Sequence, residues 1–186
     1  MQFFERANFT AFKGEKIKLL GQCLELGDVA PILNLPNPHL EDVQIAGEGN
    51  RVQVIIAVPS LDTPVCAKEA REFNEKLAQI EGVEGVIVSM DLPFAAAQFC
   101  ASEGIANIQT VSDFRDKSFA KAYGVLISKG PLEGLCARAI YIVSKDGRIV
   151  YKRIVPEITD EPDYEEVLQK ANAAANQGAS CCGFCQ

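Results

Sequence analysis

Apolar runs and amphipathic stretches alternate along the chain and predict a series of short strands and helices. Residues 52–58 and 85–90 are nearly continuous apolar runs rich in β-branched side chains, which is typical of buried strands. Residues 64–80 place apolar side chains at helical spacing among charged ones such as Glu69, so they predict an amphipathic helix. Thr63 before Pro64 fits an N-cap followed by proline in the first helical turn.

The remaining elements complete an alternation of strands and helices. The other expected elements are helices at 93–103, 118–123 and 164–175 and strands at 32–35, 108–111, 138–144 and 149–155. The last two strands form a hairpin around Asp146-Gly147, and an N-terminal β-hairpin over residues 8–19 is centred on Lys13-Gly14. The core order β-α-β-α-β-α-β-β-α predicts an α/β fold and is compatible with a thioredoxin-like fold with an N-terminal β-hairpin extension.

A single domain accounts for most of the 186 residues. We predict that it covers residues 1–175 and that residues 176–186 form a flexible, cysteine-containing tail, because the composition there changes to small and polar residues. The tail ends in the cluster Cys181-Cys182-Gly183-Phe184-Cys185. This cluster can bind a metal, act as a C-x-x-C reductant or have no role, although zinc usually takes four ligands and the tail offers three.

Charge and hydropathy exclude several classes of partner. The formal net charge is −7 and no run of Lys or Arg stands out, which argues against nucleic acid and against an anionic membrane. Charged residues interrupt the first 20 positions, so a signal peptide is not expected, and no apolar stretch approaches the ~18 residues of a membrane span. We therefore expect a soluble cytoplasmic protein.

Seven cysteines dominate the candidate chemistry. Their number is odd and no secretory signal precedes them, so a static disulfide framework fits poorly. Redox chemistry, metal binding and simple burial of free thiols remain as explanations. The positions are 23, 66, 100, 136, 181, 182 and 185.

Cys66 has the most informative position, about one turn into the helix that follows a buried strand. The unpaired N–H groups of a first helical turn favour a thiolate there. Thr63, three residues earlier, places its hydroxyl on the same side, where it can donate a hydrogen bond to the thiolate or to a peroxide. Pro59 and Pro64 stiffen the loop and shield the sulfur. From position alone, a buried core cysteine behind an ordinary N-cap explains these residues equally well.

Pro59, Thr63 and Cys66 fit the peroxiredoxin pattern P-x-x-x-T-x-x-C, and the string SLDTPVC at 60–66 resembles the bacterial thiol peroxidase branch, the atypical two-cysteine peroxiredoxins. The resemblance runs from about Phe9 to Leu168. Further matching segments are GDVAP at 27–31, REFN at 71–74, SMDLPFA at 89–95, FC at 99–100, SDFRD at 112–116, AYGV at 122–125 and ARA at 137–139. So many short matches in order make a chance similarity implausible.

The resemblance implies roles for three residues. Cys66 is then the peroxidatic cysteine, which passes through a sulfenic acid, and Cys100 is the resolving cysteine of the same chain. Arg138 is the cation that stabilises the Cys66 thiolate and polarises the peroxide. The alternatives are a core cysteine at Cys100, next to Phe99, and an arginine at Arg138 that extends to solvent from the end of a strand.

The residues themselves add one expectation about Cys100. It lies on a helix that stops at Gly104, so this helix can fray, and it is 34 positions from Cys66 on a different helix. A disulfide needs Cα atoms within ~7 Å. We therefore predict that a local unfolding step brings the two sulfurs together.

The resemblance also implies a reaction cycle. Hydrogen peroxide and organic hydroperoxides are the expected substrates, thioredoxin the expected reductant, and a homodimer the expected assembly, with no metal or organic cofactor required. The site offers apolar residues for an organic substrate. They are Val65, Leu92, Phe94 and Phe99.

Other assignments fit less well. A thiol-disulfide oxidoreductase normally has C-x-x-C at the helix start, and Cys66 is followed by Ala67-Lys68-Glu69. The single histidine, His39, lies in an expected surface loop, so a Cys-His protease dyad is not favoured. No nucleotide-binding glycine motif is present. A binding protein that uses the tail cluster for redox sensing or metal storage remains as the rival class. Cys23 and Cys136 are interpreted as structural, although Cys136 is two residues from Arg138.

Overall fold

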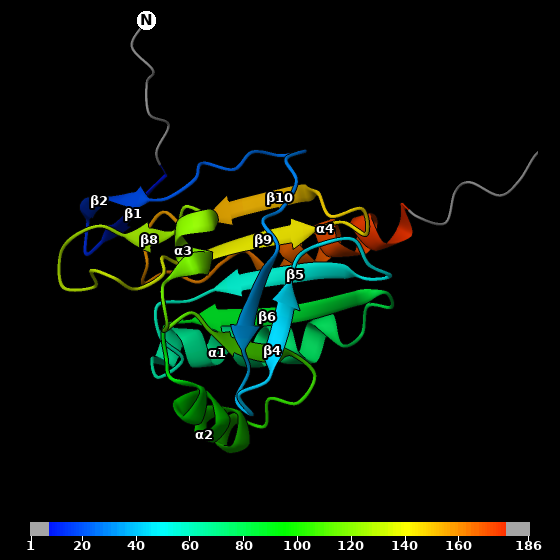
Figure 1. Ribbon diagram of the computed structural model, residues 1–186, viewed down its shortest axis with the longest axis horizontal. Helices are drawn as coiled ribbons and strands as arrows, with labels where there is room; N and C mark the ends of the chain where they lie inside the picture. Colours follow the sequence, from blue (N-terminus) through cyan, green and yellow to red (C-terminus); the bar gives the residue numbers. More distant parts are fainter. Residues whose placement is uncertain (1–7, 178–186) are drawn as a thin grey trace, which may run out of the picture.

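A five-stranded sheet forms the centre of the computed structural model, which describes residues 8–177 (Figure 1). Its strands lie in the order β10-β9-β5-β6-β7. The strands are β5 (Val52–Ala57), β6 (Val83–Ser89), β7 (Gln109–Ser112), β9 (Ala139–Val143) and β10 (Ile149–Ile154). The β5-β6 and β6-β7 pairs are parallel, whereas β9 runs antiparallel to both β5 and β10. This arrangement confirms the predicted α/β, thioredoxin-like core.

Both faces of this sheet are covered, which explains the continuous apolar run of β5. Val54 and Ile56 point into an apolar cluster with residues of α1 (Pro64–Leu77) and α4 (Tyr164–Asn176). Ile55 and Ala57 point into a second cluster, which includes residues of α3 (Ser118–Ala122). Successive side chains of a strand face opposite sides. Figure 1 shows α1 and α4 behind the sheet and α3 in front of it.

The predicted N-terminal hairpin is present and belongs to a separate small sheet. It consists of β1 (Phe9–Phe12) and β2 (Glu15–Leu20), and β2 also pairs with β8 (Leu126–Ile127). Lys13 and Gly14 form the turn with φ of 52° and 82°. Positive φ at both central residues is the geometry of a type I′ turn, which matches the right-handed twist of a hairpin.

Two short strands were not predicted. The strand at 32–35 is present as β3 (Leu33–Pro36), but its antiparallel partner β4 (Asp42–Ile45) and the two-residue β8 were missed. Polar and apolar residues do alternate along β4 from Asp42 to Ile45, and their burial alternates in the same way, but the pattern is only four residues long. The two missed strands are therefore too short for a local pattern to stand out.

The helix α2 (Pro93–Glu103) lies at one side of the molecule, below β6 in Figure 1. It begins without a side-chain cap at Leu92 and ends at Gly104, whose φ of 68° is left-handed. Only Pro93 and Ala96 are fully buried in this helix. The glycine stop was predicted, and α2 has two buried residues where α1 has five.

The described residues contain no helix that is long and apolar enough to cross a membrane. Helix α1 ends at Leu77, earlier than the predicted residue 80, and α4 continues to Asn176. The tail cysteines Cys181, Cys182 and Cys185 lie outside the described residues, so the predicted tail and its boundary stay predictions.

Candidate active site

Cys66 lies in the first turn of α1, directly after the loop that leaves β5. Thr63 is the N-cap residue, with extended φ and ψ of −132° and 145°. Its hydroxyl oxygen accepts a hydrogen bond from the backbone N–H of Cys66 at 3.3 Å, and its O–H donates to the carbonyl oxygen of Ser60 at 3.4 Å. The structure therefore brings Thr63 next to Cys66, but its hydroxyl contacts the backbone rather than the sulfur. Pro59 is buried in the same loop.

Asp91 holds this loop from the neighbouring strand. Its carboxylate accepts hydrogen bonds from the Ser60 hydroxyl at 2.8 Å and from the Leu61 backbone N–H at 2.6 Å. Asp91 follows the carboxyl end of β6, which runs parallel to β5, so both strand ends meet at the same edge of the sheet. No role for Asp91 was expected from the sequence, because only the parallel pairing of β5 and β6 brings it to the loop.

Arg138 reaches Cys66 from the start of β9. Ile140 and Ile142 point into the cluster that contains Cys66. Arg138 lies two residues before Ile140, so its side chain faces the same side of the sheet. The side chain is 2% exposed, so the alternative that it extends to solvent is wrong. Nη2 donates to the Cys66 sulfur at 3.2 Å, Nη1 donates to the Glu69 carboxylate, and Nε donates to the Ile158 carbonyl oxygen at 3.0 Å.

Glu69 is the main feature that the sequence analysis missed. It was counted with the charged positions of the helix, but it is fully buried and pairs with Arg138. Its Oε1 has no hydrogen-bond partner among the described residues. Burial raises the pKa of Glu69 to about 7, although the Arg138 charge acts in the opposite direction. The available signal was its position three residues after Cys66 and one before Ala70, on the buried face of α1.

The guanidinium of Arg138 is thus held between a carboxylate and a sulfur. Burial opposes its charge, but Glu69 and Cys66 together outweigh this effect and raise the pKa of Arg138 further. A buried ion pair is costly unless its hydrogen bonds are satisfied, and here each guanidinium nitrogen has an acceptor. The arrangement keeps a positive charge against the Cys66 sulfur in a water-poor site.

A cavity of about 460 Å³ opens between the start of α1 and α2. Cys66 is not one of its lining residues, although Thr63, Pro64 and Ala67 are, and it is 1% exposed. Of the four apolar residues expected near the site, only Phe99 is among the cavity's lining residues. Val65 is half-buried, whereas Leu92 and Phe94 are 52% and 67% exposed. The lining residues are Leu61, Asp62, Thr63, Pro64, Ala67, Asp91, Ala95, Gln98, Phe99, Ser102 and Glu103.

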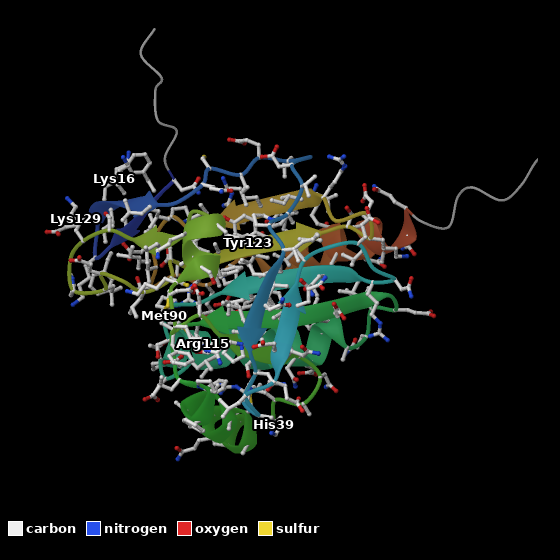
Figure 2. All side chains as sticks on the ribbon, viewed as in Figure 1. Lys16, His39, Met90, Arg115, Tyr123 and Lys129 are labelled. Carbon is white, nitrogen blue, oxygen red and sulfur yellow. The ribbon has the colours of Figure 1, made fainter. Side chains whose placement is uncertain are left out.

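Cys100 lies on α2 in a different environment. It is half-buried and borders the apolar cluster that contains Cys66, and both are free thiols. Its sulfur is 3.4 Å from the Thr110 hydroxyl of β7. Cys100 also lines a second cavity of about 310 Å³ together with His39. Figure 2 shows His39 at the turn between β3 and β4, so the expected loop position is confirmed.

Known proteins resemble this chain over most of its length. Residues 25–168 match the redoxin family. A thiol peroxidase of Campylobacter jejuni is 50% identical over 174 residues, which are 94% of this chain and 95% of the relative. The chain belongs to the redoxin family. A thiol peroxidase of Aquifex aeolicus is 49% identical over 158 residues, 85% of this chain and 93% of its own.

Solved structures agree with this assignment. The crystal structure of a peroxiredoxin-like protein from Aquifex aeolicus gives a TM-score of 0.86 at 46% identity and covers 89% of this redoxin and 96% of its own chain. A thiol peroxidase from Chromobacterium violaceum gives 0.81 at 22% identity, over 91% and 98% of the two chains, and shows the same fold. This redoxin is thus a thiol-dependent peroxidase of the peroxiredoxin class.

The other cysteines of the described residues lie elsewhere. Cys136 is fully buried in the cluster on the opposite face of the sheet from Cys66, and burial raises the pKa of its thiol far above the usual range. The Cys23 sulfur donates to the Asn8 side-chain oxygen at 3.4 Å. Within residues 8–177, no group of three His, Cys, Asp or Glu side chains is arranged to hold a metal ion.

Proposed function

We propose that this redoxin reduces hydroperoxides with Cys66 as the peroxidatic thiolate and Cys100 as the resolving thiol. The contact between Arg138 Nη2 and the Cys66 sulfur carries the proposal, because it places a fixed cation where a thiolate would form. The first-turn N–H groups of α1 act in the same direction.

In the first step, the Cys66 thiolate attacks the terminal oxygen of the hydroperoxide. The sulfur–oxygen bond forms as the O–O bond breaks, and the leaving alkoxide or hydroxide takes up a proton and departs as an alcohol or water. Cys66 is oxidised to a sulfenic acid, and the peroxide is reduced. Arg138 offsets the negative charge that develops on the oxygens. Thr63 and Pro59 keep the loop in place around the sulfur.

In the second step, the Cys100 thiol condenses with the Cys66 sulfenic acid, so that a disulfide forms and water leaves. Cys66 and Cys100 belong to different helices, and we propose that one of them leaves its folded position to meet the other. Helix α2 is the candidate, because it has no side-chain cap at its start and only two fully buried residues.

In the third step, the two thiols of thioredoxin supply two electrons and return both cysteines to the reduced state. Hydrogen peroxide and organic hydroperoxides are the proposed substrates. Leu61 and Phe99 give the 460 Å³ cavity an apolar part that suits an alkyl group. We further propose that the protein acts in the cytoplasm as a homodimer, for which the exposed Leu92 and Phe94 offer apolar surface.

The test is peroxide consumption with thioredoxin and its reductase. Cys66→Ser should abolish activity, and Cys100→Ser should stop turnover after one equivalent of peroxide. Cys23→Ser is a matched control, since Cys23 is also a free, half-buried cysteine, and it should keep wild-type activity. Full activity of Cys66→Ser would overturn the proposal. Continued turnover of Cys100→Ser with thioredoxin as the only reductant would refute the resolving role.

A further inference from the structure

The loop after β10 contacts both the N-terminal hairpin and Arg138. The Ile158 carbonyl accepts the Nε–H of Arg138 at 3.0 Å, and the Ile158 N–H donates to the Ala11 carbonyl at 2.9 Å. The Val155 N–H donates to the Arg138 carbonyl at 2.9 Å. A continuous series of hydrogen bonds therefore joins β1 to the arginine that contacts Cys66.

Two further side chains fasten the hairpin to the same loop. The buried hydroxyl of Thr10 donates to the Val155 carbonyl at 2.9 Å. At the hairpin turn, the Glu157 carboxylate accepts the N–H groups of Lys13 at 3.2 Å and of Gly14 at 3.0 Å. These bonds, led by the one from Gly14, lower the pKa of Glu157, so the carboxylate stays charged at neutral pH.

We propose that the N-terminal hairpin is a positioning element for Arg138. Thr10 and Glu157 are the residues that hold the Ile158 carbonyl in place as the acceptor of the Arg138 Nε–H. The inference rests on the function proposed above for Cys66 and Arg138. The hairpin lies before residues 25–168, the region that matches the redoxin family, so the family match does not account for these contacts.

The geometry of a guanidinium explains why one carbonyl matters. The group is a rigid plane, so its orientation is set by the acceptors that it meets. The Nε bond to Ile158 adds a third fixed acceptor to those that Glu69 and Cys66 provide. If the loop moves, Glu69 alone orients the plane, and the bond from Nη2 to the sulfur loses its alignment. Hydrogen bonds weaken steeply as their angle departs from linear.

The test compares four single variants of the full chain. Thr10→Val and Glu157→Ala remove the two contacts, and Thr10→Ser keeps the hydroxyl. Asp146→Ala is the matched control, because Asp146 is an exposed acid at the turn of the β9-β10 hairpin, at the opposite end of β9 from Arg138. The readout is the rate of Cys66 alkylation by iodoacetamide against pH, followed on the Cys66 peptide by mass spectrometry.

We expect Thr10→Val and Glu157→Ala to move the midpoint of this pH profile upward by about one unit, which corresponds to a tenfold change in ionisation. Their rate with hydrogen peroxide at pH 7 should fall about threefold to tenfold. Thr10→Ser and Asp146→Ala should keep the wild-type midpoint. Melting temperatures of all four variants show how far each change acts through stability.

Wild-type midpoints in both Thr10→Val and Glu157→Ala would overturn the proposal, and a lowered melting temperature with an unchanged midpoint would mean a purely structural hairpin. Glu157 is on the surface, so its variant remains informative if Thr10→Val does not fold. Failure of the proposed function has a different signature, because the wild-type Cys66 peptide would then resist oxidation by peroxide.

Discussion

Cys66 and Cys100 lie in the same half of the molecule, but their surroundings differ in every respect that limits movement. Cys66 is 1% exposed, contacts a buried arginine and belongs to a helix with a threonine cap and five buried residues. Cys100 is half-buried, has its sulfur 3.4 Å from the Thr110 hydroxyl and belongs to a helix with no side-chain cap at its start and two buried residues. The difference matches the proposed cycle, in which one thiol stays fixed for the peroxide and the other moves to it.

Among changes in the surroundings of Cys66, we expect the removal of the Arg138 guanidinium to have the largest effect. Arg138→Met should lower the rate of Cys66 oxidation by about 100-fold, because the fixed cation is lost. It should also lower the free energy of unfolding by about 3–5 kcal/mol, because Glu69 is left buried without its partner. Stopped-flow oxidation and urea unfolding measure the two effects.

The exposed Arg148 provides the control for this prediction. Arg148→Met should change neither quantity appreciably. An oxidation rate for Arg138→Met within threefold of wild type would contradict the role given to the guanidinium.

Glu69, in the region around Cys66, should make the free energy of unfolding depend on pH. The pKa of Glu69 is raised from its ordinary 4.5 to about 7, so the folded state holds its proton more tightly than the unfolded state. This stabilising contribution is fully present below about pH 4.5 and is lost as the pH rises through 7. The free energy of unfolding should therefore fall by up to about 3 kcal/mol over this range, relative to Glu69→Gln.

Urea unfolding of both proteins at pH 4.5, 5.5 and 7 measures this difference. Parallel pH dependence in wild type and Glu69→Gln would show that the carboxyl does not titrate in this range.

A substitution at Gly104, which ends the helix that carries Cys100, should have the smallest effect. Its φ is 68°, and a Cβ there would meet nothing within 4 Å, so Gly104→Ala adds only backbone strain. We expect a cost of about 1 kcal/mol and about fivefold faster amide exchange in α2. Exchange in α1 should be unchanged, and disulfide formation after peroxide treatment should be faster.

Gly130→Ala is the matched control, because Gly130 has a φ of 87° and equally open surroundings in a loop away from α2. It should leave exchange in α2 unchanged. Equal acceleration in α1 and α2 by Gly104→Ala would argue that the two helices open as one unit, against the contrast drawn above.

The features that a local pattern encodes were predictable from the sequence. The apolar run of β5, the cap at Thr63 and the glycine stop of α2 each depend on neighbouring residues, and the structure confirms all three. Together they place Cys66 at the start of a helix and Cys100 on a loosely held one.

Contacts between distant residues were not predictable from a local pattern, and the one between Arg138 and Cys66 was expected only from the family resemblance. Glu69 lies on the apolar face of α1, but only Arg138, 69 positions later, explains why a carboxylate is buried there. Asp91 reaches the active-site loop through the parallel pairing of β5 and β6. The contact between Thr10 and Val155 spans 145 positions, so no window of sequence contains both residues.

The most direct test of the cycle is a disulfide map after a single oxidation. The reduced full-length protein is treated with one equivalent of hydrogen peroxide without reductant, then digested without reduction and analysed by mass spectrometry. The account predicts one new cross-linked pair, the Cys66 and Cys100 peptides, with a mass two hydrogens below their sum. An oxidised Cys66 with Cys100 still a free thiol, or a bond from Cys66 to Cys136 or a tail cysteine, would contradict it.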